Sequence, residues 1–282
     1  MEKNTHHFIA CGAEYARSRT VIFGAPFDGT TSYRPGARFA PAAIRNESYG
    51  IETFSPYLEK DLADLEIFDA GDLELPVGDS TLALAAIESH TAKILADGKR
   101  PLMLGGEHLV TLGAVRAAAA LHKNLRIIHF DAHCDLRDDY LGVKLSHAAV
   151  LRRCHEILGD NRIYQFGIRS GDRAEFEWAK GRVKTHRFGF QNLTETVSLI
   201  DRNPVWLTVD LDVLDPACFP GTGTPEAGGV TFPELLAALR AVSPLNIIGL
   251  DFVELSPPYD QSGASTALAC KLLREMLLML PK

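Results

Sequence analysis

The 282-residue chain is poor in cysteine: it has only Cys11, Cys134, Cys154, Cys218 and Cys270, and no two of them form a C-x-x-C pair. This odd, widely spaced set argues against a disulfide scaffold and against a zinc ribbon, because both need closely paired thiols. The set is typical of reduced thiols inside a cell. We therefore expect a cytoplasmic location.

Features that would direct the chain to a membrane or to nucleic acid are also missing. No apolar run approaches the roughly 18–20 residues that cross a bilayer, and residues 1–8 lack the long apolar segment of a signal peptide. The formal net charge is −7, whereas neutralising phosphates requires a surplus of basic residues. We expect no membrane and no nucleic acid as partners.

The remaining composition is that of an ordinary globular protein. Hydrophobic residues make up 46% of the chain and charged residues 23%, which leaves little room for a large disordered region. A chain of this length can bury a sizeable core without disulfides or a structural metal. Because no stretch rich in proline, glycine or serine divides it, we predict a single domain spanning 1–282.

Short apolar runs alternate with helical stretches, and this alternation predicts an α/β fold, either an open doubly wound sheet or a barrel. Several runs are apolar throughout, which suits a parallel sheet covered on both faces. The expected strands are 20–25, 66–70, 101–104, 125–130, 162–168, 183–188, 205–210 and 246–253. The expected helices are 40–48, 80–97, 109–121, 146–158, 172–180, 192–202, 231–242 and 264–280.

Polar residues gather at the ends of four predicted strands. Asp131 follows the strand that ends at 130, and Asp210 closes the strand at 205–210. Glu254 follows 246–253, and the segment Gly105-Gly-Glu-His108 follows 101–104. Ligands bind outside the carboxyl ends of the strands in an open parallel sheet, so we expect these groups at one edge.

The densest of these segments is Asp131-Ala-His-Cys-Asp135. Positions 131, 133 and 135 share one face while the backbone stays extended, because side chains alternate along a strand. An Asp-Leu-Asp segment at 210–212 has the same spacing. Imidazoles bind transition metals, and carboxylates favour Mn²⁺ or a similar ion. The predicted metal ligands are His108, Asp131, His133, Asp135, Asp210 and Asp212.

Charge favours two ions at this site. The four aspartates carry −4 and two divalent cations +4, while a buried carboxylate without a cation costs several kcal/mol. Two metals about 3.5–4 Å apart share one water and lower its pKa toward 7. Each segment alone has an ordinary explanation, since Asp-x-Asp pairs often cap strands or helices. Their joint position after predicted strands favours the metal site.

Two other histidines and one cysteine are close to this site in the sequence. His129 lies inside a predicted strand, where we expect a core histidine with satisfied hydrogen bonds. His147 follows the 131–135 segment after a polar loop and can lie near the metals without binding them. Cys134 is expected to point into the sheet as a small apolar residue; the alternative is a thiol that reacts under oxidants.

Further motifs accompany these segments in a fixed chain order. They are Ser32–Arg45, Leu104–His108, Asp131–Asp135, Ser146-His147, Val209–Pro216, Gly221–Gly229 and Asp251–Glu254. Together they resemble the motifs of the ureohydrolase family, which includes arginases and agmatinases, and the bacterial agmatinases above all. Glu107 replaces an aspartate often found in the family, and Ala148 a glycine; neither change removes an expected chemical group.

The resemblance implies a three-layer α/β/α sandwich around a mainly parallel eight-stranded sheet, with chains assembled as homo-oligomers, either trimers or hexamers. It implies two Mn²⁺ ions, for which Ni²⁺ or Co²⁺ are possible replacements. One ion would be held by His108 and Asp135 and the other by His133 and Asp212, with Asp131 and Asp210 bridging them.

The same resemblance implies the catalytic roles. A hydroxide bridging the two ions would attack the guanidino carbon, and Asp135 would accept a hydrogen bond from that hydroxide. Glu254 would pair with the small cationic guanidino substrate, and Thr224 would line its pocket. His147 would contact the substrate and pass a proton to the leaving amine.

The implied reaction is the hydrolysis of agmatine to urea and putrescine. Arginine, 4-guanidinobutyrate and guanidine are alternative substrates, and a two-metal phosphoesterase or a non-catalytic metal-binding relative are alternative functions. We expect the loop 136–145 to cover the tail of the substrate. Its Asp138 and Asp139 would favour an ammonium group, unless they simply belong to a solvated surface.

Overall fold

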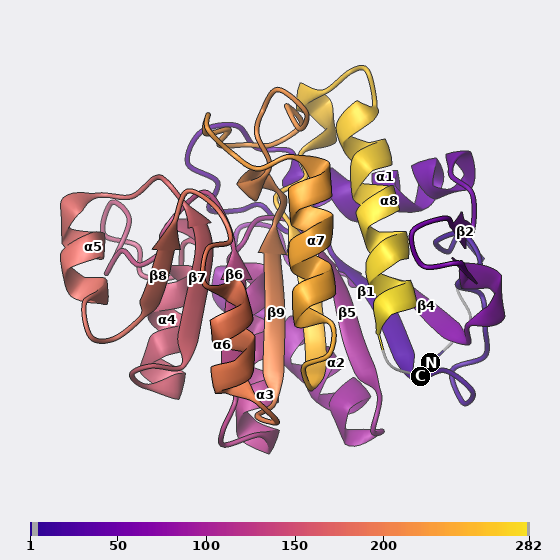
Figure 1. Ribbon diagram of the computed structural model, residues 1–282, viewed down its shortest axis with the longest axis horizontal. Coiled ribbons are helices and arrows are strands. Elements are labelled where there is room, and N and C mark those ends of the chain that lie inside the picture. Colours follow the sequence, from indigo (N-terminus) through magenta and orange to yellow (C-terminus); the bar gives the residue numbers. More distant parts are fainter. Residues whose placement is uncertain (2–4, 281–282) are drawn as a thin grey trace.

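The computed structural model describes residue 1 and residues 5–280. Its centre is an eight-stranded sheet in the order β4-β1-β5-β10-β9-β6-β7-β8, and neighbouring strands pair in parallel (Figure 1). These strands are β1 (Thr20–Ala25), β4 (Ile67–Asp72), β5 (Arg100–Gly105), β6 (Arg126–Phe130), β7 (Ile163–Ile168), β8 (Lys184–Arg187), β9 (Val205–Asp210) and β10 (Ile247–Val253).

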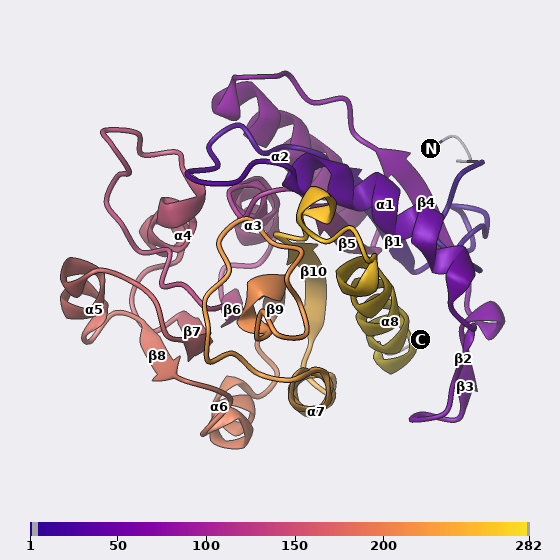
Figure 2. The same ribbon diagram turned by 90° about the horizontal axis from the view of Figure 1, so that it is seen from above.

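Helices cover both faces of the sheet, with α2, α3 and α4 on one side and α6, α7 and α8 on the other (Figure 2). The two hydrophobic clusters follow this division: one joins the sheet to α1, α6, α7 and α8, the other to α2–α5. The helices are α1 (Ala40–Glu47), α2 (Ser80–Ala96), α3 (Val110–Leu121), α4 (Val150–Leu158), α5 (Arg173–Ala179), α6 (Leu193–Ile200), α7 (Phe232–Val242) and α8 (Ala264–Met279). The three-layer α/β/α prediction is confirmed.

The predicted strands are present, with ends shifted by at most two residues. The predicted helix at 146–158 begins as a 3-10 turn, His147–Ala149, before α4. The antiparallel pair β2 (Phe54–Ser55) and β3 (Lys60–Asp61) was not predicted, because two residues per strand leave no hydrophobic pattern. The single-domain assignment stays a prediction, and its residues 2–4 and 281–282 lie outside the described residues.

The order of the strands creates a crevice in the middle of the sheet. The chain builds β1 and β4 on one side and β6, β7 and β8 on the other, and then inserts β9 and β10 between the two halves. In open α/β sheets, ligands bind at such a switch in strand order, outside the carboxyl ends. Four adjacent strands, β5, β10, β9 and β6, therefore deliver their following residues to one place.

Within the described residues, every helix falls short of the length or hydropathy that a membrane span requires.

Candidate active site

His108 follows β5, and its ring is fixed by a chain of hydrogen bonds behind it. Its Nε2 lies 2.9 Å from Thr208 Oγ1, which donates to Asp251 Oδ1 at 2.6 Å. Because the Thr208 hydroxyl hydrogen goes to Asp251, the same oxygen accepts the Nε2 hydrogen of His108. In the neutral ring, the Nδ1 atom of His108 then has a lone pair that faces the crevice, as a metal ligand requires.

Three carboxylate oxygens surround His108 Nδ1. Asp131 Oδ2 lies at 3.1 Å, and Asp135 Oδ2 and Asp210 Oδ2 each lie at 3.2 Å. Nδ1 is buried, and among the described residues no partner is placed for a regular hydrogen bond. Ligand atoms bound at right angles to one ion, about 2.1 Å from it, lie about 3.0 Å apart. Each of the three oxygens therefore lies from Nδ1 at the spacing of two neighbouring ligands of one ion.

A second group of ligand atoms adjoins the first. His133 Nδ1 lies 3.0 Å from Asp212 Oδ2 and 3.5 Å from Asp131 Oδ1. Asp131 therefore faces the His133 group with one oxygen and His108 with the other. One buried carboxylate between two donor groups is the arrangement expected of a bridging ligand.

Backbone amides aim these carboxylates. Asp131 Oδ1 accepts from His133 N at 2.5 Å, Asp210 Oδ1 from Asp212 N at 2.9 Å, and Asp212 Oδ1 from Ala132 N at 3.2 Å. For Asp210 and Asp212, the other oxygen of each carboxylate turns toward a histidine. The structure thus brings all six predicted ligands together.

Asp135 lies in the cluster, but the backbone that places it there is not the extended strand that we expected. Strand β6 ends at Phe130, and Asp135 has a φ of 52°, so the segment 131–135 is not extended and the alternation argument is wrong for this residue. Its carbonyl oxygen accepts from the amides of Leu151 and Arg152 at the start of α4. A turn held by this helix directs the carboxylate to His108.

The electrostatics of the cluster favour cations. Burial and the Asp131 charge raise the pKa of Asp135 to about 7, and burial with the charges of Asp212 and Asp131 raises the pKa of Asp210. Burial opposes a charge on His108, yet the facing carboxylates raise its pKa well above the usual value. The neighbouring histidines instead lower the pKa of Asp131. Burial and mutual repulsion at Asp135 and Asp210 are costs that divalent cations would offset, so the donor set fits a metal centre.

A cavity of about 290 Å³ adjoins the cluster, and three other predicted site residues line it: Glu254, Thr224 and His147. Glu254 follows β10 with a φ of 65°, and its Oε1 accepts from His108 N at 2.7 Å. Thr224 Oγ1 lies 3.4 Å from Asp212 Oδ2. Positive φ at two cavity-lining carboxylates, Glu254 and Asp135, is strain of the kind that collects at functional sites.

His147 is held by two residues of an earlier loop, Thr30 and Ser32. Ser32 begins the Ser32–Arg45 motif, but neither residue was predicted to belong to the site. Its backbone amide donates to Thr30 Oγ1 at 3.1 Å, and its Nε2 lies 3.1 Å from Ser32 Oγ. Thr30 is anchored in turn by buried Glu107, which accepts from its hydroxyl at 2.6 Å. Burial lowers the pKa of His147 to about 4, so its imidazole is neutral near pH 7.

The outer part of the cavity is lined by Arg137 and Tyr140 of the 136–145 loop and by Asp172 and Glu175 at the start of α5. Arg137 Nη1 lies 3.2 Å from Asp172 Oδ2, and its Nε lies 3.6 Å from Glu175 Oε2. In the sequence, residues 172–175 form a D-x-x-E capping box. Such a pattern is expected at the start of any helix and does not by itself indicate a functional site. Sequence reasoning therefore missed both carboxylates.

The structure places the side chains of Asp138 and Asp139 away from the residues that line the cavity. Asp138 pairs with Arg153 at 3.0 Å, and Asp139 Oδ1 accepts from Gly142 N within the tight turn of the loop. Neither residue lines the cavity. These contacts agree with the alternative interpretation, in which both aspartates belong to the solvated surface of the loop.

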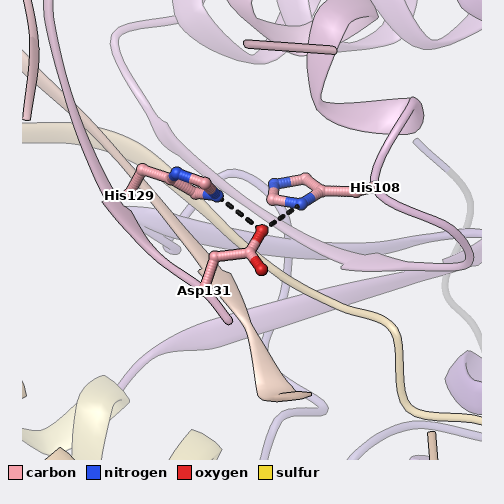
Figure 3. Close-up of side chains that lie close together, drawn as sticks. All are labelled: His108, His129 and Asp131. Atoms are coloured by element: carbon pink, nitrogen blue, oxygen red, sulfur yellow. Dashed lines mark hydrogen bonds and ion pairs between the residues drawn. The ribbon is translucent and has the colours of Figure 1, made fainter. Parts of the chain in front are cut away.

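His129 contacts the candidate metal ligands, although we expected only a core histidine. It is fully buried, and its Nε2 lies 2.7 Å from Asp131 Oδ2. Figure 3 shows His129 and His108 on either side of Asp131, with both rings directed at its carboxylate. Burial lowers the pKa of His129, so this ring is neutral near pH 7.

Cys134 lies in the hydrophobic cluster with α3 and α4, as expected of a small apolar residue. Burial raises the pKa of its thiol well above the usual range. Since the thiolate is the reactive form, this environment argues against the oxidation-sensitive alternative.

The protein has an open parallel α/β sheet, and a cluster of histidines and carboxylates lies at its central crevice. This combination is typical of a metal-dependent enzyme. Residues 18–279 match the model of the Arginase family, so the chain belongs to that family. It is a ureohydrolase.

Individual relatives cover almost the whole chain. The agmatinase of Bacillus subtilis is 47% identical over 96% of this chain and 95% of its own length. The guanidinobutyrase of Pseudomonas aeruginosa is 37% identical, covering 95% of this chain and 88% of its own. The crystal structure of the agmatine ureohydrolase of Thermoplasma volcanium is 36% identical with a TM-score of 0.90, covering 98% of this chain and 94% of that one.

Proposed function

We propose that this enzyme hydrolyses the guanidino group of agmatine to give urea and putrescine. One observation carries the proposal: three of the six converging side chains, His133, Asp135 and Asp210, line a cavity whose wall also contains a buried carboxyl group, Glu254. A guanidinium and a carboxylate form paired, charge-assisted hydrogen bonds. A planar cation held by Glu254 would thus lie beside the candidate metal centre.

The proposed cofactor is a pair of Mn²⁺ ions, with Ni²⁺ or Co²⁺ as alternatives. His108 and Asp135 would hold one ion and His133 and Asp212 the other, and Asp131 and Asp210 would bridge them. The short contacts support this division for His108 with Asp135, for His133 with Asp212 and for Asp131 between them. The bridging role of Asp210, which contacts His108, follows from the family resemblance. The ions would activate water as a nucleophile at neutral pH. Carboxylate and imidazole donors suit each of these metals.

The residues of the cavity would orient the substrate and move its protons. Glu254 would hold the guanidinium, which is planar and a poor electrophile, and Thr224 would form part of the same wall. Asp135 would accept a hydrogen bond from the attacking water. The carbon–nitrogen bond breaks only when the departing amine gains a proton, and His147 lines the cavity within reach of this task.

The low pKa of His147 determines when this residue can donate a proton to the leaving amine. A neutral imidazole near pH 7 cannot donate at the start of the cycle. We propose that it first takes up the proton released when water attacks and then passes it to the amine. Its contact with Ser32 Oγ fixes the ring during that exchange.

The charge of the outer cavity supports agmatine over substrates with a carboxylate tail. Two carboxyl groups, Asp172 and Glu175, face the single guanidinium of Arg137, which pairs with both of them. Burial raises the pKa of Glu175. A surplus of carboxyl groups over cations favours the ammonium of agmatine and disfavours the carboxylate of 4-guanidinobutyrate. The higher identity to an agmatinase than to a guanidinobutyrase points the same way. Cytoplasmic location and assembly into trimers or hexamers remain predictions.

Urea release from a substrate panel tests this proposal. The Mn²⁺-loaded enzyme is assayed with agmatine, arginine, 4-guanidinobutyrate and guanidine, with a phosphate ester as a control for phosphoesterase activity. We expect the highest kcat/KM with agmatine. A preference for 4-guanidinobutyrate or arginine would contradict the substrate assignment, and no urea from any of them would contradict the proposed reaction.

A further inference from the structure

We infer that His129 is a positioning residue for Asp131, and that Gln165 determines which ring nitrogen of His129 carries the hydrogen. His129 is therefore not a metal ligand, although its ring lies close enough to Asp131 and His108 to be considered one. This inference rests on the proposed metal site and is independent of which guanidino compound is the substrate.

The orientation of the Gln165 side chain is fixed by its neighbours. One hydrogen-bond partner of its Nε2 is the carbonyl oxygen of Cys134, at 2.7 Å, which can only accept. Its Oε1 accepts from Thr185 Oγ1 at 3.0 Å. The amide nitrogen must therefore face Cys134, and its second hydrogen points at His129 Nδ1, 3.0 Å away.

This contact determines the tautomer of His129. Because Nδ1 accepts from Gln165, the ring hydrogen is on Nε2, which lies 2.7 Å from Asp131 Oδ2 and donates to it. Both nitrogens are then occupied, so no lone pair is left for a metal. Thr185 thus fixes the orientation of the Gln165 amide, and Gln165 fixes the tautomer of His129. His129 in turn donates a hydrogen bond to Asp131.

The hydrogen bond from His129 orients Asp131, a carboxylate that faces both predicted histidine ligands. Asp131 Oδ1 is fixed by the amide of His133, and Oδ2 by His129. Both oxygens are thus oriented by hydrogen bonds from the protein itself, with Oδ2 facing His108. A partner of this kind typically contributes 10–100-fold to metal affinity, because it removes the cost of orienting the ligand.

Two nearly identical variants separate this role from space filling. In His129→Gln the amide nitrogen reaches the position of the ring Nε2 and can donate to Asp131. In His129→Asn the shorter side chain reaches only the position of Nδ1, next to Gln165. Mn²⁺ binding is titrated into the metal-depleted full chain of each variant and of the wild type, and thermal unfolding of the metal-depleted proteins serves as the measure of folding.

We expect His129→Gln to keep the wild-type Mn²⁺ affinity within about threefold and His129→Asn to lose at least tenfold, with two ions per chain bound in both. Equal affinities in both variants and the wild type would overturn the inference. Loss of one whole equivalent of Mn²⁺ from both variants would identify His129 as a ligand and also overturn it. A wild-type chain that binds no Mn²⁺ would refute the proposed metal site itself.

If the variants do not fold, the tautomer can be read in the wild-type protein. The ¹⁵N spectrum of histidine-labelled full chain loaded with diamagnetic Zn²⁺ distinguishes a hydrogen on Nε2 from one on Nδ1. We expect the Nε2–H form at His129, and the Nδ1–H form would overturn the inference.

Discussion

At the scale of the residue, the site depends on which side chains can bind a cation and which can only transfer a proton. His108 Nδ1 faces three carboxylate oxygens within 3.2 Å, whereas His147 contacts Ser32 and Thr30, neither of which is a predicted ligand. The same residue type therefore has two different environments. Variants at the two positions should fail in different ways.

The first prediction contrasts these two histidines. His108→Ala should abolish urea release and reduce the bound metal, because it removes a donor that other residues cannot replace. His147→Ala should keep the metal and lower kcat about 10²–10⁴-fold, the usual contribution of a general acid or base. Elemental analysis and steady-state kinetics measure the two effects. A His147→Ala protein without metal would count against the proton-transfer role.

The second prediction concerns pH and follows from the burial of His147. An unfolded histidine binds a proton below a pH of about 6.5, but burial holds the pKa of folded His147 at about 4. As the pH falls through this interval, the unfolded chain gains a proton that the folded chain does not, so the free energy of unfolding decreases.

The decrease amounts to about 2 kcal/mol between pH 7 and pH 5. Denaturant unfolding of the wild type and of His147→Gln at these two pH values isolates the contribution. The wild type should lose about 2 kcal/mol more than the variant. The same loss in both proteins would show that folded His147 titrates normally.

At the scale of the element, the turn between β5 and α3 brings His108 into place. Gly106 lies against the chain at Phe27: a Cβ on this glycine would come 1.9 Å from the Phe27 carbonyl oxygen. The amide of Glu107 also donates to that oxygen, at 2.8 Å. The turn can approach this loop only because residue 106 has no side chain.

The third prediction tests that close approach. Gly106→Ala should lower the free energy of unfolding by about 2 kcal/mol or more, because a backbone atom must move, and it should also weaken metal binding through His108. Gly50→Ala is the matched control, since a Cβ there would meet nothing within 4 Å. Unfolding curves and Mn²⁺ titrations compare the two. A Gly106→Ala protein as stable as Gly50→Ala would contradict the prediction.

Elements of this fold were largely predictable, because continuous apolar runs such as 205–210 mark buried parallel strands directly. The site was predictable where its residues follow these runs, as Asp131, Asp210 and Glu254 do. The position of Asp172 in the site was not predictable, because a helix cap fully explains the D-x-x-E pattern that begins at this residue. Thr30 was not predictable, and Ser32 was noted only as the first residue of the Ser32–Arg45 motif, because their contacts with His147 bridge more than a hundred residues of sequence.

At the scale of the whole molecule, the strand order unites the site. His108, Glu254, Asp210 and Asp131 come from β5, β10, β9 and β6, which are neighbours in the sheet although β5 and β10 are far apart in the chain. Bound cations would therefore link both halves of the sheet. Their binding energy adds to the stability of the native fold.

The fourth prediction is that metal removal destabilises the entire molecule. A ligand at 100 times its Kd stabilises the native state by about 2.7 kcal/mol per site, which for a chain of this size corresponds to several degrees in Tm. Calorimetry with Mn²⁺ and with a chelator measures the difference. Equal melting temperatures would show that the cluster binds no ion under those conditions.

The most direct test of the central claim is the anomalous scattering of crystals grown with Mn²⁺. We predict two peaks per chain inside the cluster, one bordered by His108 and Asp135 and the other by His133 and Asp212, with Asp131 and Asp210 between them. A single peak, peaks elsewhere, or none at full urea-releasing activity would contradict the paired-metal site.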